Sequence, residues 1–313
     1  MHLIISEKLD ISTNEVLKWL TFYKQKVLII DKNKEVEVNF SDGFDKPTFT
    51  YNAVRFSMDD IESIWFRRGR IKIVYDFDLN VEKNLLQYHI NTKQTIEIFV
   101  NYLLINNRRH LGNPFRTDVN KLEVLYVAKE CGLTIPETML SDNSNQVLAG
   151  LGKDNIVTKL LVPLPFEHLE HEKRLNYLTF GYDFEANKDK EFTLSLFQKK
   201  IEKRFEIRTF FINDEMFSKA IFSQNDDMTT VDYRNYNHET PNRTEPFILP
   251  KNIQNRIKKL MKRLSLDCGS LDFIVDTHDN FIFLEVNPVG QFSDMSYNCN
   301  YELEKKIALF LKN

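Results

Sequence analysis

The chain has 313 residues, of which 42% are hydrophobic and 28% are charged, and its formal net charge is −3. A chain of this length and composition is expected to fold around a substantial core, divided into two or three subdomains. The slightly acidic balance gives no sign of a nucleic-acid partner. No apolar run approaches the roughly 20 residues that span a bilayer, so no membrane partner is expected.

The first residues and the cysteines indicate a cytoplasmic protein. The N-terminus, MHLIISEKLD, lacks a basic segment followed by a long apolar stretch, so no signal peptide is expected. Cys131, Cys268 and Cys299 are odd in number and widely spaced. They predict packing in the core rather than disulfides or a CxxC metal site.

The N-terminal segment predicts a strand, a helix and a second strand. HLIIS and KVLII are short apolar runs typical of strands in a parallel sheet. Between them, Ser12 and Glu15 stand at capping-box spacing, which predicts the start of a helix. No GxGxxG follows the first strand and GxxxxGKS/T is absent throughout, so neither the usual dinucleotide fold nor a P-loop is expected.

The segment VEKNLLQYHINTKQTIEIFVNYLLIN predicts a long helix. Its apolar stripe consists of Ile96, Phe99, Val100, Leu103 and Leu104, and a stripe at this spacing indicates core packing. The pattern then breaks at Gly112 and Pro114, which predicts a domain boundary. A further helix, within NKLEVLYVAKECGLTIPET, is expected to end at Gly132.

Strand-like runs dominate residues 155–250, with a predicted hairpin turn at Asn213 and Asp214. Amphipathic helices are expected in NIQNRIKKLMKRLSL and in the C-terminal YELEKKIALFLKN. The first carries its apolar residues at Ile253, Ile257, Leu260, Met261 and Leu264, and the second at Leu303, Ile307, Phe310 and Leu311. This mixed order predicts an α+β or α/β protein of several lobes rather than one doubly wound sheet.

The segment LDFIVDTHDNFIFLEVNPVGQF predicts two apolar strands joined by a polar turn, and both strands carry acidic side chains. If the turn is Thr277–Asn280, Asp276 pairs with Phe281 and Asp272 lies opposite Glu285. The Cβ atoms of Asp272 and Glu285 would then be about 5 Å apart. Two carboxylates at that separation repel unless a cation lies between them.

Asn287 extends this acidic pair, because it lies two residues after Glu285 and shares its face of the strand. Two carboxylates and an amide oxygen suit Mg²⁺, which usually shares its oxygen ligands with substrate phosphates. The alternative is a solvated face of the hairpin, and these residues alone leave it open. Phe281 and Phe283, expected on the face of Glu285, and the following PVG turn favour a ligand site.

This hairpin resembles that of the ATP-grasp superfamily, in which an Asp on one strand and Glu-x-Asn on the next hold the magnesium ions of Mg-ATP. The match falls on Asp272, Glu285 and Asn287. Segments upstream resemble the other family motifs in the expected order. The resemblance implies a nucleotide contact at Lys121 in NKLEVLYVAKECGLTIPET and a phosphate contact at Lys159 in IVTKLL.

The segment FQKKIEKRFEIRTFFIND resembles the hinge between the two lobes that enclose ATP. The resemblance implies that the backbone around Lys199, Lys200 and Ile201 hydrogen-bonds adenine. It also implies that Glu206 accepts a hydrogen bond from the ribose and that Arg208 faces the phosphates. Lys199 stands where the family often has Glu, but the implied contact is mainly through the backbone.

Within the superfamily, the sequence is most similar to the graspetide synthetases, the microviridin-type and grasp-with-spasm peptide maturases. The likeness covers roughly residues 60–313 and rests on IWFRRGR, FEIRTFFINDEMFSKAIFSQ, DYR, NPVGQF and NCNYELEKKIALFL. VDYRN resembles the segment that brings Arg234 to the transferred phosphoryl group. One departure is LVPLPFEHLE, which follows the lysine strand where many ATP-grasp enzymes have a glycine-rich loop.

The resemblance implies an ATP-grasp fold with an N-terminal α/β domain over 1–112, a central lobe over 113–198 and a C-terminal lobe over 199–313. It also implies an ATP- and Mg²⁺-dependent ligase. Asp or Glu side chains of a ribosomal precursor peptide, with leader and core, become acyl-phosphates and react with Ser, Thr or Lys to form macrocyclic esters or amides. Arg208 and Arg234 would be catalytic, because phosphoryl transfer depends on positioning and charge neutralisation.

Several residues have simpler alternatives that the sequence leaves open. In the alternative interpretation, Lys159 and Lys121 are exposed lysines that reach solvent, and Arg234 is a solvated residue of a polar loop. Arg208 would pair with Glu206 on one face of a sheet. Arg67 and Arg68, which end the apolar run SIWF, would either meet an acidic peptide or form a solvated strand end.

Two other functions also stay open. One is an ATP-grasp ligase that adds an amino acid to a protein or small molecule, and the other is a non-catalytic, ATP-dependent peptide-binding protein. The graspetide-like tail argues against the first, and the intact set of Asp272, Glu285, Asn287 and Arg234 argues against the second. An exposed apolar patch in the N-terminal lobe would support a homodimer.

Overall fold

The computed structural model describes residues 1–75, 82–153, 155–161, 179–184, 187, 191–223 and 242–313. Contacts divide the chain into two compact units. Unit 1 comprises Met1–Asp118, Ser265–Gly269 and Pro288–Asn313, and unit 2 comprises Val119–Leu264 and Ser270–Asn287. The finer division into three domains, with boundaries at residues 112 and 198, stays a prediction.

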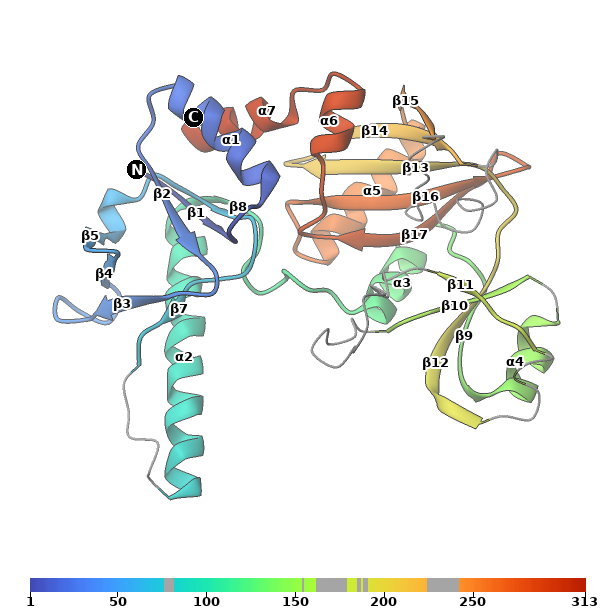
Figure 1. Cartoon of the computed structure of the whole chain (residues 1–313), viewed down its shortest axis with the longest axis horizontal. Coiled ribbons are helices and arrows are strands. Elements are labelled where there is room, and N and C mark those ends of the chain that lie inside the picture. Colours follow the sequence, from blue (N-terminus) through green and yellow to red (C-terminus); the bar gives the residue numbers. More distant parts are fainter. Residues whose placement is uncertain (76–81, 154, 162–178, 185–186, 188–190, 224–241) are drawn as a thin grey trace. The chain divides into compact units, whose positions relative to one another are not determined.

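Unit 1 is built on a parallel sheet with strand order β2-β1-β6-β8, of which β1, β2 and β8 are labelled in Figure 1. The strands are β1 (His2–Ser6), β2 (Val27–Asp31), β6 (Ser63–Phe66) and β8 (Arg109–Leu111). All residues of β1 and β6 are buried, as expected for parallel strands covered on both faces. Helix α2 (Lys83–Asn107) packs Val100 and Leu104 into the core of the sheet, and α7 (Leu303–Lys312) contacts β6 and β8.

A second four-stranded sheet of unit 1 has order β5-β4-β3-β7. Its strands are β3 (Glu35–Asn39), β4 (Thr48–Tyr51), β5 (Val54–Ser57) and β7 (Lys72–Ile73). The described residues of unit 1 also form the helices α1 (Ile11–Phe22) and α6 (Ser293–Asn298) and the 3-10 turn η1 (Met58–Asp60). Helix α1 packs against α7.

The predicted first helix is confirmed, but Asp10 caps it rather than Ser12. The Asp10 carboxylate accepts a 2.8 Å hydrogen bond from the Thr13 N–H, as an N-cap side chain does. Asp10 also has the extended backbone that an N-cap requires, with φ −67° and ψ 109°. Glu15, the expected partner of Ser12, forms an ion pair with Lys18 instead.

Arg67, directly after β6, is not a solvated strand end, because its side chain is only 3% exposed. Its guanidinium donates to the carbonyl of Val289 at 2.7 Å and to Gln291 Oε1 at 3.0 Å, and it lies 3.4 Å from Asp10 Oδ1. Arg68 donates to the other Asp10 oxygen at 2.9 Å. The two arginines therefore tie the end of β6 to the start of α1, and Arg67 also holds the loop at 289–291.

Asp10 predicts a specific acid sensitivity. Burial raises the pKa of its carboxyl, but the charge of Arg67 and hydrogen bonds from Arg68 and Thr13 outweigh burial and lower the pKa from 3.8 to about 2. Stability from this carboxylate is therefore present above about pH 4 and is lost as the pH falls toward 2. Asp10→Asn should destabilise unit 1 near neutral pH, and its difference from wild type should shrink below about pH 4 in urea titrations. The exposed Asp42→Asn is the control; a wild-type-minus-Asp10→Asn difference that stays constant with pH would contradict the assignment.

Unit 2 contains two sheets. The first has order β11-β10-β12-β9 and is antiparallel at each pairing. Its strands are β9 (Thr138–Asn143), β10 (Ile156–Lys159), β11 (Phe180–Gly181) and β12 (Glu191–Lys199). Helix α4 (Ser144–Leu151) packs Val147 and Leu151 against Phe197 of β12. Helix α3 (Lys121–Glu130) ends before Gly132, whose φ is +81°, so the predicted helix end is confirmed.

The second sheet of unit 2 has order β15-β14-β13-β16-β17 (Figure 1). Its strands are β13 (Lys203–Ile212), β14 (Glu215–Phe222), β15 (Arg243–Phe247), β16 (Cys268–Asp276) and β17 (Phe281–Asn287). The turn at Asn213 and Asp214 is confirmed, with φ of 44° and 69° as a two-residue hairpin loop requires. Helix α5 (Lys251–Arg263) buries the predicted stripe.

The β16–β17 hairpin places Asp272 opposite Glu285, as predicted, but by a different route. The loop has three residues, because Asp279 adopts a φ of 63° and the Asp276 N–H bonds the carbonyl of Asn280 rather than pairing with Phe281. A β-bulge at Leu284 then cancels this one-residue offset. The predicted turn is therefore wrong and the predicted acidic pair is confirmed.

The bulge also changes the faces of the hairpin. Phe283 pairs with Phe273, and their rings meet edge to face at 5.4 Å. Because Asp272 and Phe273 are adjacent in β16, they point to opposite faces. The expectation that Phe281 and Phe283 share the face of Glu285 is therefore wrong, and the aromatic rings pack on the other side of the sheet.

The three cysteines are free and buried, so the prediction that they pack rather than form disulfides is confirmed. Across the described part of the chain, no helix combines the length and hydropathy needed to cross a bilayer.

Candidate functional site

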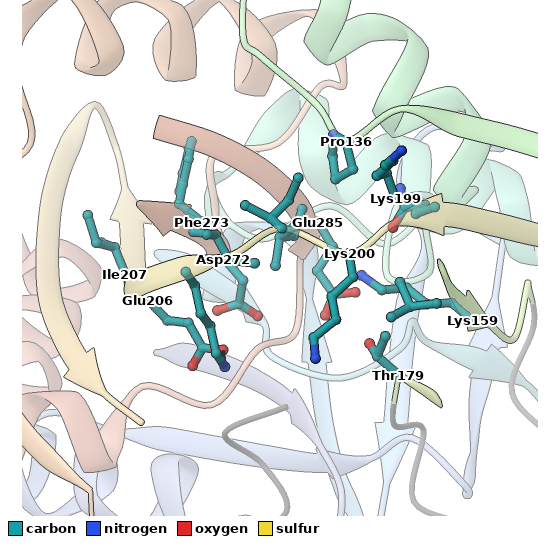
Figure 2. A pocket seen from close by; sticks show the side chains of 16 residues that line it. Pro136, Lys159, Thr179, Lys199, Lys200, Glu206, Ile207, Asp272, Phe273 and Glu285 are labelled. Carbon is teal, nitrogen blue, oxygen red and sulfur yellow. Dashed lines mark hydrogen bonds and ion pairs between the residues drawn. The ribbon is translucent and has the colours of Figure 1, made fainter. Parts of the chain in front are cut away.

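A cavity of about 710 Å³ lies between the two sheets of unit 2 (Figure 2). Its wall draws on β10, β12, β13, β16 and β17, and on the connection between β12 and β13. Seven residues implied by the family resemblance line it, namely Lys159, Lys199, Lys200, Ile201, Glu206, Asp272 and Glu285. They come from segments up to 126 residues apart, as 159 to 285 shows, so folding gathers motifs that the sequence leaves scattered.

Asp272 sits in the wall of this cavity and is paired with Arg208. The Asp272 side chain is 13% exposed, and that of Arg208 is 16% exposed. One terminal nitrogen of Arg208 donates to both carboxylate oxygens of Asp272, at 3.1 and 3.2 Å. The two residues lie on the neighbouring strands β13 and β16, which places this ion pair across the sheet. Arg208 thus contacts a predicted metal ligand directly.

The acidic pair and Asn287 form a donor set that fits Mg²⁺. Asp272 lies opposite Glu285, and Ser270 lies opposite Asn287 with no bulge between these pairs, so Glu285 and Asn287 share a face as predicted. Within the described ranges, no three His, Cys, Asp or Glu side chains gather as a complete protein-only site. Two carboxylates and an amide leave positions for phosphate and water oxygens, which is how Mg²⁺ is commonly bound.

Lys203 and Glu206 form a buried ion pair in the cavity wall, with side chains 3% and 7% exposed. Lys203 Nζ donates to Glu206 Oε1. Residues three apart on a regular strand point to opposite faces, so sequence spacing alone does not predict this pair. A buried carboxylate needs such a partner to stay ionised. Lys203 therefore supports Glu206, and it is a site residue that the sequence analysis missed.

The backbone N–H groups of the hinge residues Lys199, Lys200 and Ile201 differ in their hydrogen bonds. The Lys199 N–H donates to the backbone carbonyl of Glu137 at 2.9 Å, and the Lys200 N–H donates to the backbone carbonyl of Asn155 at 2.6 Å. The Lys199 side chain reaches the carbonyl of Leu151 at the end of α4, 3.2 Å away. For Ile201, no backbone acceptor occurs among the residues that the structure covers. Of the three hinge N–H groups, those of Lys199 and Lys200 are thus already bonded to backbone carbonyls.

Lys159 lies where the cavity meets a smaller hollow of about 330 Å³, which Lys121 and Glu285 also line. Lys121 is the first residue of α3, and its Nζ donates to the carbonyl of Leu160 at 2.5 Å. Figure 2 shows Lys159 and Lys200 extending into the same region as the carboxylates of Asp272 and Glu285. Lysines and carboxylates therefore converge there, as a metal-bound phosphate chain requires.

Two parts of the predicted site lie outside the described residues. Arg234 belongs to 224–241, and most of LVPLPFEHLE belongs to 162–178. The proposed role of Arg234 and the contacts of the segment after the lysine strand stay predictions.

Gln198, directly before the hinge, is a further residue that lines the cavity. Its side chain is buried, with the residue 2% exposed, and it donates a hydrogen bond to Thr138 Oγ1 at 3.1 Å.

No protein-family model and no curated protein matches the sequence. Solved structures match its fold over almost the whole chain. The macrocyclase MdnC of Microcystis aeruginosa MRC, solved with the precursor peptide MdnA, is 24% identical with a TM-score of 0.72, covering 100% of both chains. A RiPP-associated ATP-grasp ligase of Chryseobacterium gregarium, solved with ADP and a leader and core peptide, is 21% identical with a TM-score of 0.74, covering 99% of this chain and 94% of that one.

The ATP-grasp ligase PsnB, solved with a minimal precursor, Mg and ADP, is 11% identical with a TM-score of 0.69, covering 99% of this chain and 96% of the other. These likenesses establish the fold. The protein has the architecture of the ATP-grasp ligases, and the predicted fold class is confirmed.

Proposed function

We propose that the protein is an ATP- and Mg²⁺-dependent ligase that crosslinks a precursor peptide through its Asp or Glu side chains. The observation that carries this proposal is the convergence of Lys159, Lys200, Glu206, Asp272 and Glu285 on one cavity. The fold is that of ligases whose structures contain ADP and peptides. Because the same fold can host different activities, the proposed activity is inferred from the residues of the site.

The nucleotide would bind through the hinge and the ion pair beside it. The Ile201 N–H and the carbonyls of neighbouring hinge residues would hydrogen-bond adenine. Glu206, paired with Lys203, would accept hydrogen bonds from the ribose hydroxyls. Lys159, together with Lys121 in the adjoining hollow, would neutralise phosphate charge at the other end of the cavity.

Asp272, Glu285 and Asn287 would hold Mg²⁺, which when bound would offset the charge of the nucleotide phosphates. Arg208 keeps Asp272 in place through their ion pair and is our candidate, with Arg234, for neutralising charge on the transferred phosphoryl group. Arginine suits this role because its planar fork engages two oxygens at once.

In the proposed reaction, a peptide carboxylate takes the γ-phosphoryl group, giving ADP and an acyl-phosphate. A Ser or Thr hydroxyl or a Lys amine of the same peptide then attacks the acyl carbon, phosphate leaves, and the nucleophile gives up its proton. Each ester or amide ring therefore removes one water from the peptide.

The proposed setting is cytoplasmic, with no nucleic acid or membrane taking part. Exposed Tyr88, Ile98 and Tyr102 on α2 support a homodimer.

Mass spectrometry of a candidate peptide encoded beside the gene tests the proposal. With protein, ATP and Mg²⁺, the peptide should lose one or more waters while ADP forms, and it should stay unchanged without ATP. A mass gain on the acceptor would replace the proposal with a ligase that adds an amino acid. Tight ATP binding without turnover under any peptide would replace it with a binding protein.

A further inference from the structure

A second hollow, of about 550 Å³, lies in unit 1 at the carboxyl ends of the parallel strands. Its lining comes from the segments after β2, β6 and β8, with Lys32, Asn33, Gly69, Arg70, Lys72, Pro114 and Thr117 contributing. Because β2, β6 and β8 run parallel to β1 or to each other, these segments meet at one edge of the sheet. The edge is part of no site described above.

The topology of the sheet marks this edge as a place for ligands. From β1 the chain passes to β2 on one side and later to β6 on the other, so the strand order reverses between β1 and β6. In open α/β sheets, ligands bind outside the carboxyl ends of the strands at such a reversal, where the connecting segments diverge and leave a crevice. The hollow lies at this edge, beside the reversal.

The hollow is cationic. Lys32, Arg70 and Lys72 line it, and no carboxylate of the described residues does. Lys32 Nζ bonds Glu7 at 2.5 Å. For Arg70 and Lys72, no carboxylate partner occurs within the part of the chain that the structure describes, and Lys72 is exposed. Two positive charges at this edge are therefore available to a ligand.

Gly69 gives the hollow its shape. Its φ is +78°, a region that side chains other than glycine rarely adopt. A Cβ atom at this position would lie 3.2 Å from the Lys32 Cβ, so glycine lets the turn after β6 approach the turn after β2 closely. The close approach brings Arg70 and Lys32 to one opening.

We propose that this hollow binds a carboxylate-rich segment of the peptide substrate; this rests on the proposed function, which requires a peptide with Asp or Glu side chains. Separate cations from two chain segments, Lys32 after β2 and Arg70 and Lys72 after β6, match several carboxylates along an extended peptide better than one small anion. Guanidinium groups pair with carboxylates through two parallel hydrogen bonds. The hollow therefore selects an acidic segment, while the cavity of unit 2 carries the chemistry.

The test uses a dye-labelled hexaglutamate peptide and the full chain, with binding followed by fluorescence anisotropy. The double variant Arg70→Gln/Lys72→Gln should weaken binding about tenfold, equivalent to about 1.4 kcal/mol. The matched control is Lys46→Gln/Arg55→Gln, which removes two exposed cations of unit 1 outside the hollow and should leave binding within about twofold. ATP binding, measured separately, should be unchanged in both double variants.

Equal losses in the two double variants, or no loss in either, would overturn the proposal. Displacement of the peptide by inorganic phosphate at lower concentration than by unlabelled hexaglutamate would also overturn it, since the hollow would then favour phosphate. The proposed ligase function fails separately, if the wild-type chain binds no ATP while hexaglutamate binding still depends on Arg70 and Lys72.

Discussion

Glu285→Ala is expected to lower the rate of peptide crosslinking by about 10³-fold, which corresponds to about 4 kcal/mol of lost transition-state stabilisation. The reason is geometric, because Glu285 is the carboxylate opposite Asp272 and faces the same cavity. Without it, one carboxylate and one amide remain to hold the cation that offsets phosphate charge. Water loss from the peptide and ADP formation, followed over time, measure the effect.

Two further variants separate this effect from a folding defect. Glu285→Gln keeps the shape of the side chain and removes its charge, so it should lose nearly as much activity as Glu285→Ala. Asp279→Ala lies on the same hairpin at its exposed tip, outside the cavity, and should keep the wild-type rate within about twofold. Wild-type rates in Glu285→Ala would mean that the hairpin is not the metal site.

Arg67→Met is expected to destabilise unit 1 by about 3–5 kcal/mol, because it removes one of the two arginines that compensate the buried Asp10 carboxylate and the donor that bonds Val289 and Gln291. Arg67 is almost fully buried and bonds Asp10, Val289 and Gln291. Both tryptophans of the chain, Trp19 and Trp65, belong to unit 1. Tryptophan fluorescence in urea therefore follows this unit specifically, which matters because a chain of two units need not unfold in one step.

Arg55→Ala is the control for Arg67, since it removes an exposed arginine of the same unit and should shift the urea midpoint little. Arg67→Lys should rescue only part of the loss, because an ammonium group lacks the planar fork that reaches three acceptors at once. A urea midpoint for Arg67→Met equal to that of Arg55→Ala would show that the network contributes little to the stability of unit 1.

Much of the fold was predictable because its signals are local. The helix end at Gly132, the turn at Asn213 and Asp214 and the apolar stripe of α5 each depend on residues close in sequence. The acidic pair of the hairpin was predicted correctly although the turn was not. The left-handed backbone conformation of Asp279 and the bulge at Leu284 depend on the surrounding sheet, and each shifts the strand register by one residue.

The residues that the sequence did not indicate depend on tertiary contacts. Lys203 stands three positions from Glu206 in a strand, a spacing that regular alternation places on opposite faces. Arg67 looked like the charged end of an apolar strand until its acceptors at 289–291, more than 200 residues later, were in place. Neither side chain has a periodic or motif signal, because its partners are defined only after the chain folds.

The division of the chain has a consequence for synthesis on the ribosome. Unit 1 needs residues 265–269 and 288–313 as well as its first 118 residues, whereas most of unit 2 is one continuous stretch. The parallel sheet of unit 1 emerges early, but α7, which packs against β6 and β8, follows unit 2 in the chain. Domains usually form in the order in which they are translated. Here part of the packing of the first-made sheet waits for a helix that follows unit 2 in the chain, so unit 1 completes its fold after most of unit 2 has emerged.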